Sequence, residues 1–307
     1  MTEMKFVFGP VPSRRLGISL GISPIPKKTC NYSCVYCQLG RTDHMSNARE
    51  MFFSVHEIME EFNEILKSGF VFDVVTIVGE GEPTLYFGMG ELIEQLKEQT
   101  SKPIAVITNG ALLYEPQLRL ELAKADIVLP TMDAYDERSL KAINRPHKEI
   151  EFSQVFDGLK VFSKEYSGQL WIEIMLLAGV NDDDVSLHKY LEMLAELKYE
   201  RLYLNTPVRP PAEKQVKPLG EAGMRHAVEV LGGISLDFFA SEGFQSNLHD
   251  SYAAIMSIIK RHPMNQFEIE SFLKIRNEDA IVFLRRLESD SAVKVVNYKG
   301  YKTYRLR

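Results

Sequence analysis

All three cysteines of this chain stand in one short segment, which reads Lys28-Thr29-Cys30-Asn31-Tyr32-Ser33-Cys34-Val35-Tyr36-Cys37. Three thiolates in the spacing CxxxCxxC can hold one face of a 4Fe–4S cluster and leave the fourth iron without a protein ligand. An open metal position suits small-molecule chemistry, whereas a closed position is usually structural. The segment therefore predicts a reactive iron–sulfur centre with Cys30, Cys34 and Cys37 as its ligands.

Two other uses of these cysteines are open from the spacing alone. Zinc could bind the same thiolates with His44 as a fourth ligand, but zinc sites more often pair two CxxC-like halves, and the chain has no second half. A disulfide is disfavoured because three is an odd number and the N-terminus carries no secretory signal. The residue types thus favour iron–sulfur over zinc.

Composition is typical of a soluble globular protein. The 307 residues are 45% hydrophobic and 25% charged, enough for one large domain or for one large and one small domain. No apolar run is long enough to cross a bilayer, and residues 1–12 resemble neither a signal peptide nor a transit peptide. We therefore expect a cytoplasmic protein with no membrane contact.

Charge is unevenly distributed along the chain. The net charge of −6 argues against a general nucleic-acid binder. From Ser246 to Arg307, however, eleven Lys and Arg exceed seven Asp and Glu, a balance of +4 that leaves −10 in the remaining residues. This difference indicates a boundary near Gly243-Phe244, with domains at 1–243 and 244–307.

Short apolar runs alternate with amphipathic stretches through the first 240 residues. Segments 55–66 and 187–197 have helical spacing. Six runs rich in Ile, Val and Leu predict strands, at Leu16–Ile22, Val74–Val78, Ile104–Thr108, Ile127–Pro130, Trp171–Leu177 and Leu202–Asn205. Six such βα units with right-handed crossovers predict an α/β fold, a partial (β/α)6 TIM barrel. Its ligand site should lie at the carboxyl ends of the strands, where polar residues are abundant.

The C-terminal segment has a different pattern. Helical spacing is found at 248–261, 266–274 and 277–289, and two strands follow at 293–297 and 301–306. Three helices and a two-stranded ribbon resemble a winged helix, a fold that often binds DNA and also serves as a protein-docking module or lid. Because no helix here is strongly basic, we favour a docking or substrate-covering role.

The cysteine loop after the first strand makes the chain resemble the radical SAM superfamily. Gly81-Glu82-Pro83 at the end of the second strand is similar to that family's GGEP motif, with Glu80 in place of a glycine. The resemblance implies one 4Fe–4S cluster and S-adenosylmethionine (SAM) as cofactors, which together generate a 5′-deoxyadenosyl radical. It also implies that SAM is bound by Tyr36, Gly81, Glu82, Asn109, Asp133 and Asn181. Whether Glu80 or Glu82 meets the SAM ammonium is open.

A narrower resemblance is to the wyosine-synthase-related subgroup. It rests on residues 9–17, on Leu129-Pro130-Thr131-Met132-Asp133-Ala134 and on residues 204–210, and the overall layout is most like queuine lyase. That enzyme cleaves a carbon–nitrogen bond of queuine and leaves aminomethyl-deazaguanine. Wyosine synthases carry further cysteines for a second cluster, whereas this chain has none after Cys37. The absence favours a lyase acting on a free base.

A deazaguanine substrate requires carboxylates that accept from its ring N–H, its amine and its secondary ammonium. The candidates are Asp133, Glu173 and Glu80, of which Glu173 and Asp133 are also the candidate catalytic residues. Asn205 and Arg209 could bind the carbonyl edge or the diol of the substrate. Arg14 and Arg15, just ahead of the first strand, could pair with acidic groups or with the substrate.

The sequence thus predicts a radical SAM lyase acting on queuine, reduced by an electron donor such as flavodoxin or ferredoxin. Two alternatives stay open. One is a tRNA-modifying radical SAM enzyme that reads its substrate through the C-terminal segment. The other is a zinc-binding winged-helix regulator.

Overall fold

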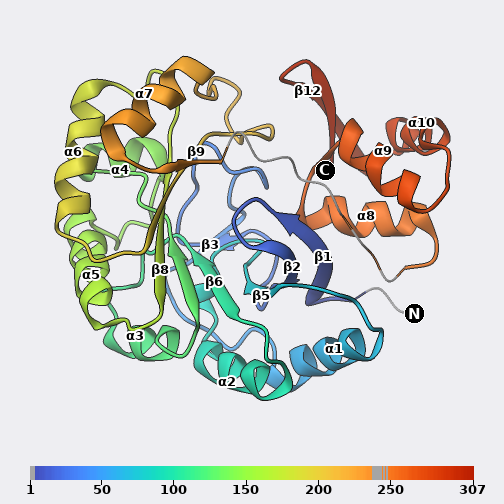
Figure 1. The fold of residues 1–307 in the computed structure, drawn as a ribbon, viewed down its shortest axis with the longest axis horizontal. Helices are drawn as coiled ribbons and strands as arrows, with labels where there is room; N and C mark the ends of the chain where they lie inside the picture. The colour runs from blue at the N-terminus through green and yellow to red at the C-terminus, as the bar shows by residue number, and fades with distance from the viewer. Residues whose placement is uncertain (1–3, 237–243, 245, 247) are drawn as a thin grey trace.

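The computed structural model describes residues 4–236, 244, 246 and 248–307. One eight-stranded sheet curves around the centre of the molecule, with helices along its outer face (Figure 1). In spatial order its strands are β1 (Val7–Ser13), β2 (Gly17–Ile22), β5 (Val74–Ile77), β6 (Ile104–Thr108), β7 (Ile127–Pro130), β8 (Gln169–Met175), β9 (Arg201–Asn205) and β10 (Ile234–Ser235). From β2 onward all neighbours are parallel, which confirms the predicted partial barrel.

The six predicted strands are all present, with ends within two residues of expectation. In this sheet, sequence reasoning missed β1 and β10, the two edge strands, and it also missed the short parallel pair β3 (Thr29–Cys30) and β4 (His44–Met45). Strand β1 contains Gly9, Pro10 and Pro12, residue types that a central strand does not tolerate and that an edge strand accepts. It pairs antiparallel with β2 and places Arg14 and Arg15 in the turn between the two strands.

Helices cover the outer face of the sheet and follow the strands in alternation (Figure 1). Ser54 and Glu57 form a reciprocal cap at the first helix, which satisfies backbone donors that the helix itself leaves free. The helices are α1 (Val55–Lys67), α2 (Met89–Gln99), α3 (Pro116–Leu122), α4 (Glu137–Ile143), α5 (Phe152–Glu165), α6 (Asp184–Ala195) and α7 (Glu221–Leu231), with a short 3₁₀ turn η1 at Pro83–Leu85. None of the helices in the described part of the chain has the length and apolar character that a membrane crossing requires.

Both faces of the parallel sheet are buried, as expected for such sheets. Phe62, Ile77 and Leu92 belong to the large core between the sheet and the outer helices. A smaller cluster that includes Trp171 and Tyr203 fills the inside of the barrel. The bottom of the barrel is therefore closed by side chains, and the open space lies at the carboxyl ends of the strands.

The C-terminal segment forms three helices and a three-stranded antiparallel sheet, and Val11 of β1 is part of their hydrophobic core. The predicted helices and ribbon are present, and the structure adds one short strand. The elements are α8 (Ser251–Arg261), β11 (Met264–Asn265), α9 (Gln266–Ile275), α10 (Ala280–Ser289), β12 (Val293–Tyr298) and β13 (Tyr301–Leu306). The predicted boundary at residue 243 lies outside the described residues. We refer to residues 248–307 as the tail.

The tail is fastened to the barrel by buried ionic contacts. Arg209, after β9, donates to Glu268 of α9 at 3.1 Å and to the carbonyl of Pro263 at 2.5 Å. On the other side, Arg261 of α8 lies 3.3 Å from Glu80, after β5. The tail therefore covers part of the carboxyl end of the barrel.

Replacing Arg209 with leucine should destabilise this attachment, because the carboxylate of Glu268 would stay buried without its cation. We expect Arg209→Leu to lower the free energy of unfolding by about 3–5 kcal/mol, measured by urea denaturation. The control is Arg225→Leu, whose side chain and partner Glu221 are both more than 60% exposed. That change should stay within about 0.5 kcal/mol of the wild type, and an equally small effect of Arg209→Leu would refute the role of the buried pair.

Candidate active site

The cysteine loop is held against the end of β5 by backbone contacts. The amide of Glu82 donates to the carbonyl of Thr29 at 3.0 Å, and the amide of Lys28 donates to the carbonyl of Glu80 at 2.5 Å. A Cβ at Gly81 would lie 1.8 Å from the carbonyl oxygen of Thr29. The glycine is therefore required by the close approach of the loop that carries Cys30.

Amide donors surround the cysteine sulfurs. The backbone N–H of Tyr32 lies 3.4 Å from Cys30 Sγ, and Asn144 Nδ2 lies 3.4 Å from Cys34 Sγ. Burial raises the pKa of all three thiols, and none is in a disulfide. Thiols in such a site lose their protons when a metal binds, and amide donors stabilise the charged sulfurs that result. The three cysteines and their surroundings fit an iron–sulfur cluster.

Glu82 ties the ends of β5 and β6 together. Its buried carboxylate accepts from the hydroxyls of Thr84 and Thr108, both at 2.6 Å, and from the backbone N–H of Asn109 at 2.7 Å. Burial raises the pKa of this carboxyl, while these hydrogen bonds lower it. The side chain of Asn109 in turn donates to Asn31 in the cysteine loop at 2.7 Å. Glu82 and Asn109 thus hold the cysteine loop against the ends of β5 and β6.

Asp133 is a second buried junction, at the end of β7. Its carboxylate accepts from the hydroxyl of Tyr36, from Asn144 Nδ2 at 2.9 Å and from the backbone N–H of Met175 at 2.9 Å. Burial raises the pKa of Asp133 to about 6, although the three donors oppose the shift. Because Asn144 contacts both Asp133 and Cys34, this network connects the end of β7 to the cysteine loop.

Asn181 is fully buried, and its side chain is used within the protein. Its oxygen accepts from the amide of Leu177 at 2.8 Å, and its nitrogen donates to the carbonyl of Met175 at 3.0 Å and to the hydroxyl of Tyr190 at 2.9 Å. The predicted SAM contact by this side chain therefore competes with an existing set of hydrogen bonds. Asn181 shapes the turn after β8.

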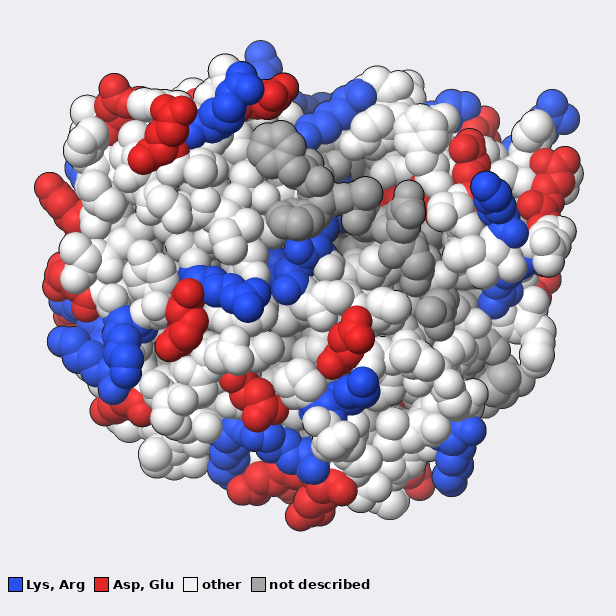
Figure 2. All heavy atoms as spheres, in the orientation of Figure 1, with Lys and Arg blue, Asp and Glu red and all other residues white. Residues whose placement is uncertain are grey.

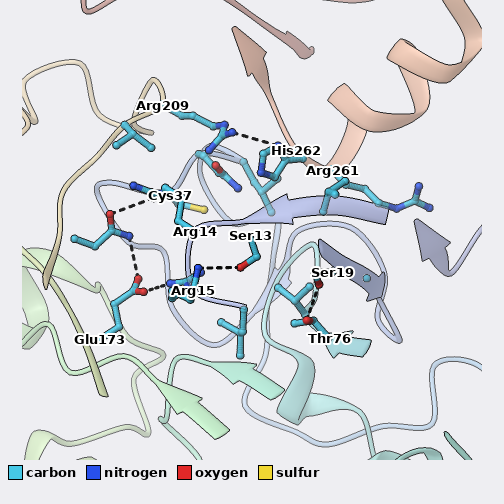
Figure 3. A pocket seen from close by; sticks show the side chains of 18 of the residues that line it. Ser13, Arg14, Arg15, Ser19, Cys37, Thr76, Glu173, Arg209, Arg261 and His262 are labelled. Carbon is cyan, nitrogen blue, oxygen red and sulfur yellow. Dashed lines mark hydrogen bonds and ion pairs between the residues drawn. The ribbon is translucent and has the colours of Figure 1, made fainter. Parts of the chain in front are cut away.

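A cavity of about 370 Å³ opens above the barrel. It is lined by the β1–β2 turn, the cysteine loop, the ends of β5, β8 and β9, and the C-terminal end of α8 with the residue that follows it. Figure 3 shows side chains from these elements around one space, with Cys37 on its wall. Six of the predicted substrate or cofactor residues line it: Tyr36, Glu80, Gly81, Glu173, Asn205 and Arg209.

Glu173 extends from β8 into this cavity and is paired. Its carboxylate forms an ion pair with Arg15 and accepts from Asn205 Nδ2 at 3.1 Å. Arg14 donates to the side-chain oxygen of Asn205 at 3.3 Å, so the four side chains form a continuous row (Figure 3). Arg15 thus pairs with an acidic group, as expected, whereas Arg14 donates to the neutral oxygens of Asn205 and Leu236.

Glu80 and Arg261 form the opposite wall of the cavity. One carboxylate oxygen of Glu80 faces Arg261 at 3.3 Å, and the other is buried without a hydrogen-bond partner among the described residues. Nearby, Arg209 Nη2 lies 3.3 Å from His262 Nδ1, and burial together with the charges of Arg209 and Arg14 holds the pKa of His262 well below its usual value. His262 is thus neutral at pH 7.

Sequence reasoning missed Asn144, Arg261 and His262 at this site. Asn144 follows α4, and no local motif distinguishes it from an ordinary helix end. Arg261 and His262 belong to the tail, more than two hundred residues from the cysteines, and only the docking of the tail brings them to the cavity. The sequence showed that the tail is basic, but it did not show which of its residues reach the cavity.

The surface around the site shows mixed charge. In Figure 2, acidic and basic side chains alternate around the margin of the visible face, and a group of basic side chains lies beside a hollow near its centre. Of the three candidate substrate carboxylates, Asp133, Glu173 and Glu80, the last two each face an arginine. Both carboxylates thus already have a cationic partner, while one oxygen of Glu80 accepts no hydrogen bond within the described residues.

Comparisons with known proteins agree with this geometry. Residues 25–191 match the model of the Radical SAM superfamily. A UPF0026 protein of Methanocaldococcus jannaschii is 34% identical over 315 residues, which cover 98% of this chain and 96% of that protein. A protein of Brachyspira hyodysenteriae named GTPase Obg is 40% identical over 225 residues, which cover 73% of this chain and 33% of that protein. This chain thus spans about a third of the second relative's length.

A solved structure of similar fold is that of TYW1 with a lysine-pyruvate adduct bound. It aligns with a TM-score of 0.55 and 19% identity, over 71% of this chain and 74% of that one. At this identity the likeness shows the fold alone. The superfamily model covers more than half of the chain, and the UPF0026 relative matches nearly all of it. The chain belongs to the radical SAM superfamily, with a 4Fe–4S cluster and SAM as its cofactors, and within it to the UPF0026 family.

Proposed function

We propose that this radical SAM enzyme is a lyase that cleaves the carbon–nitrogen bond of queuine. When bound, the cluster and SAM supply an electron and a hydrogen-abstracting 5′-deoxyadenosyl radical. The observation that carries the proposal is the cavity of about 370 Å³ between the cysteine loop and the tail. Its volume lies in the range of small-molecule sites, and the tail restricts access to it.

We assign the SAM ammonium to Glu80 instead of Glu82. A cation seeks an unused carboxylate oxygen, and Glu80 has one buried at the wall of the cavity, beside Gly81. The oxygens of Glu82 already accept from Thr84, Thr108 and Asn109. In this assignment Glu82, Asn109, Asp133 and Asn181 hold the SAM-binding loops in place, and Tyr36 positions its own loop through Asp133.

The row of Arg15, Glu173, Asn205 and Arg14 offers alternating donors and acceptors to a planar base. Glu173 can accept from the ring N–H and the exocyclic amine of a deazaguanine, as carboxylates do in charge-assisted pairs. Arg14 and Asn205 can donate to its carbonyl. In this arrangement Arg15 pairs with Glu173 and fixes the orientation of its carboxylate. Arg209, which contacts Glu268 and Pro263, positions the tail over the base.

A substrate assay tests the proposal directly. The protein is reconstituted anaerobically with iron and sulfide and incubated with SAM, dithionite and queuine, and the products are identified by mass spectrometry. We expect 5′-deoxyadenosine to rise only with queuine, together with aminomethyl-deazaguanine. Slow, queuine-independent formation of deoxyadenosine would reject the lyase proposal and direct the substrate search to tRNA.

The assignment of Glu80 predicts that two neighbouring carboxylates respond differently to the same change. Glu80→Gln should weaken SAM binding about tenfold, since a hydrogen bond to a charged group is lost, and it should also destabilise the tail, because Arg261 loses its buried ionic partner. Glu82→Gln should keep SAM affinity within about twofold of the wild type and lower the free energy of unfolding by about 1–3 kcal/mol, because buried donors lose an acceptor. Calorimetric titration with SAM and urea denaturation measure the two effects, and exchanged results would reverse the assignment.

Two further variants test the cluster and its surroundings. Cys34→Ala should leave the fold intact, by circular dichroism, while the reconstituted protein loses its brown colour and SAM cleavage. Asn144→Ala removes an amide that lies 3.4 Å from the sulfur of Cys34, so the protein should keep its iron but show a more negative reduction potential. Full SAM cleavage by Cys34→Ala would refute the ligand assignment.

A further inference from the structure

A second hollow, of about 500 Å³, lies on the outer side of the cysteine loop, between that loop and the tail. We call it the basic groove. Its described lining contains six cationic side chains and no aspartate or glutamate: Lys27, Lys28, Lys260, Lys294, Arg305 and Arg307. Lys28 has an acidic partner in Asp43, which lies 3.3 Å away and is more than half exposed.

The charges in the basic groove influence one another. The pKa of Lys27 is lowered by burial and by the charges of Lys28 and Lys260, against the opposing effect of Glu80. Arg305 is partly buried and donates to the carbonyl of Gln38 at 3.2 Å, so it is fixed in place. This concentration of positive charge stands in a chain whose net charge is −6. The groove therefore attracts an anionic partner to one defined place.

The basic groove is also adjacent to a predicted cluster ligand. Its floor is formed by Gln38, Leu39 and Gly40, which follow Cys37 directly, and the amide of Gly40 donates to the carbonyl of Cys37 at 3.1 Å. Cys30 and Cys34, by contrast, pack against a buried apolar cluster that contains Tyr32 and Leu140. The side of the loop at Cys37 is thus the route from the surface to the cluster.

We propose that the basic groove docks an acidic electron-carrier protein that reduces the cluster. The inference rests on the radical SAM chemistry of the proposed function, and it is independent of queuine as substrate. In the step it serves, the carrier is oxidised by one electron and the cluster is reduced by one. Electron transfer weakens steeply with distance, so a carrier must dock close to the cluster edge. A nucleic acid binds through many phosphates, which contact positive charges spread along a protein surface. Its binding would not require a position beside Cys37.

Docking of this kind can be tested with oxidised flavodoxin as the probe. The double variant Lys294→Glu/Arg307→Glu reverses two exposed charges of the groove on the tail. The matched control is Lys164→Glu/Lys198→Glu, on exposed positions near α5 and α6, across the molecule from the tail (Figure 1). We expect the groove variant to bind flavodoxin at least about tenfold more weakly than the control at low salt, and wild-type affinity to fall as salt is added.

The same variants separate docking from chemistry. Reduction of the cluster by flavodoxin hydroquinone should slow in the groove variant by a similar factor, while reduction by dithionite stays within about twofold of the wild type. Equal flavodoxin affinity of groove and control variants would overturn the proposal. The proposal would also be overturned if the groove variant lost tRNA binding in a gel-shift assay while its flavodoxin affinity stayed at the wild-type value. Failure of queuine turnover with dithionite would count against the lyase alone.

Discussion

The contact between Gly81 and Thr29 fixes the position of the whole cysteine loop. The loop contains little regular structure of its own, so a backbone-to-backbone approach is what places it above the barrel. The hydrogen bond from Glu82 to Thr29 and the link from Asn109 to Asn31 extend the same attachment to β6. The cavity reaches the cysteine loop that would hold the cluster, because Cys37 forms part of the cavity wall.

Above this platform the tail completes the site. A parallel barrel alone leaves its carboxyl end open to solvent, and here Arg261 and His262 supply one wall of the cavity. The two buried ion pairs that hold the tail, Arg209 with Glu268 and Arg261 with Glu80, lie at that same wall. The contacts that attach the tail to the barrel therefore also form the cavity.

Much of this arrangement could be predicted from sequence because it depends on local patterns. The apolar runs at β5 to β9 and the helical spacing of the tail are local, and so is the spacing of the cysteines. Strand β1 was missed because Pro10 and Pro12 hide an edge strand. The use of each polar residue was harder to predict. Glu82 and Asn181 were expected to contact SAM, yet their hydrogen bonds are made within the protein, by partners as distant in sequence as Thr108. Tertiary packing decides such partners, and no spacing encodes them.

The ion pair between Glu80 and Arg261 has a consequence for how the family evolves. Position 80 is occupied by a carboxylate where related motifs have glycine, and its cation comes from the tail. In a relative without the tail, the side chains at positions 80 and 209 would face solvent, where water replaces their lost ionic partners at little cost. Arg209 should therefore vary freely in relatives that lack this segment, whereas Glu80 would be kept wherever it still binds SAM.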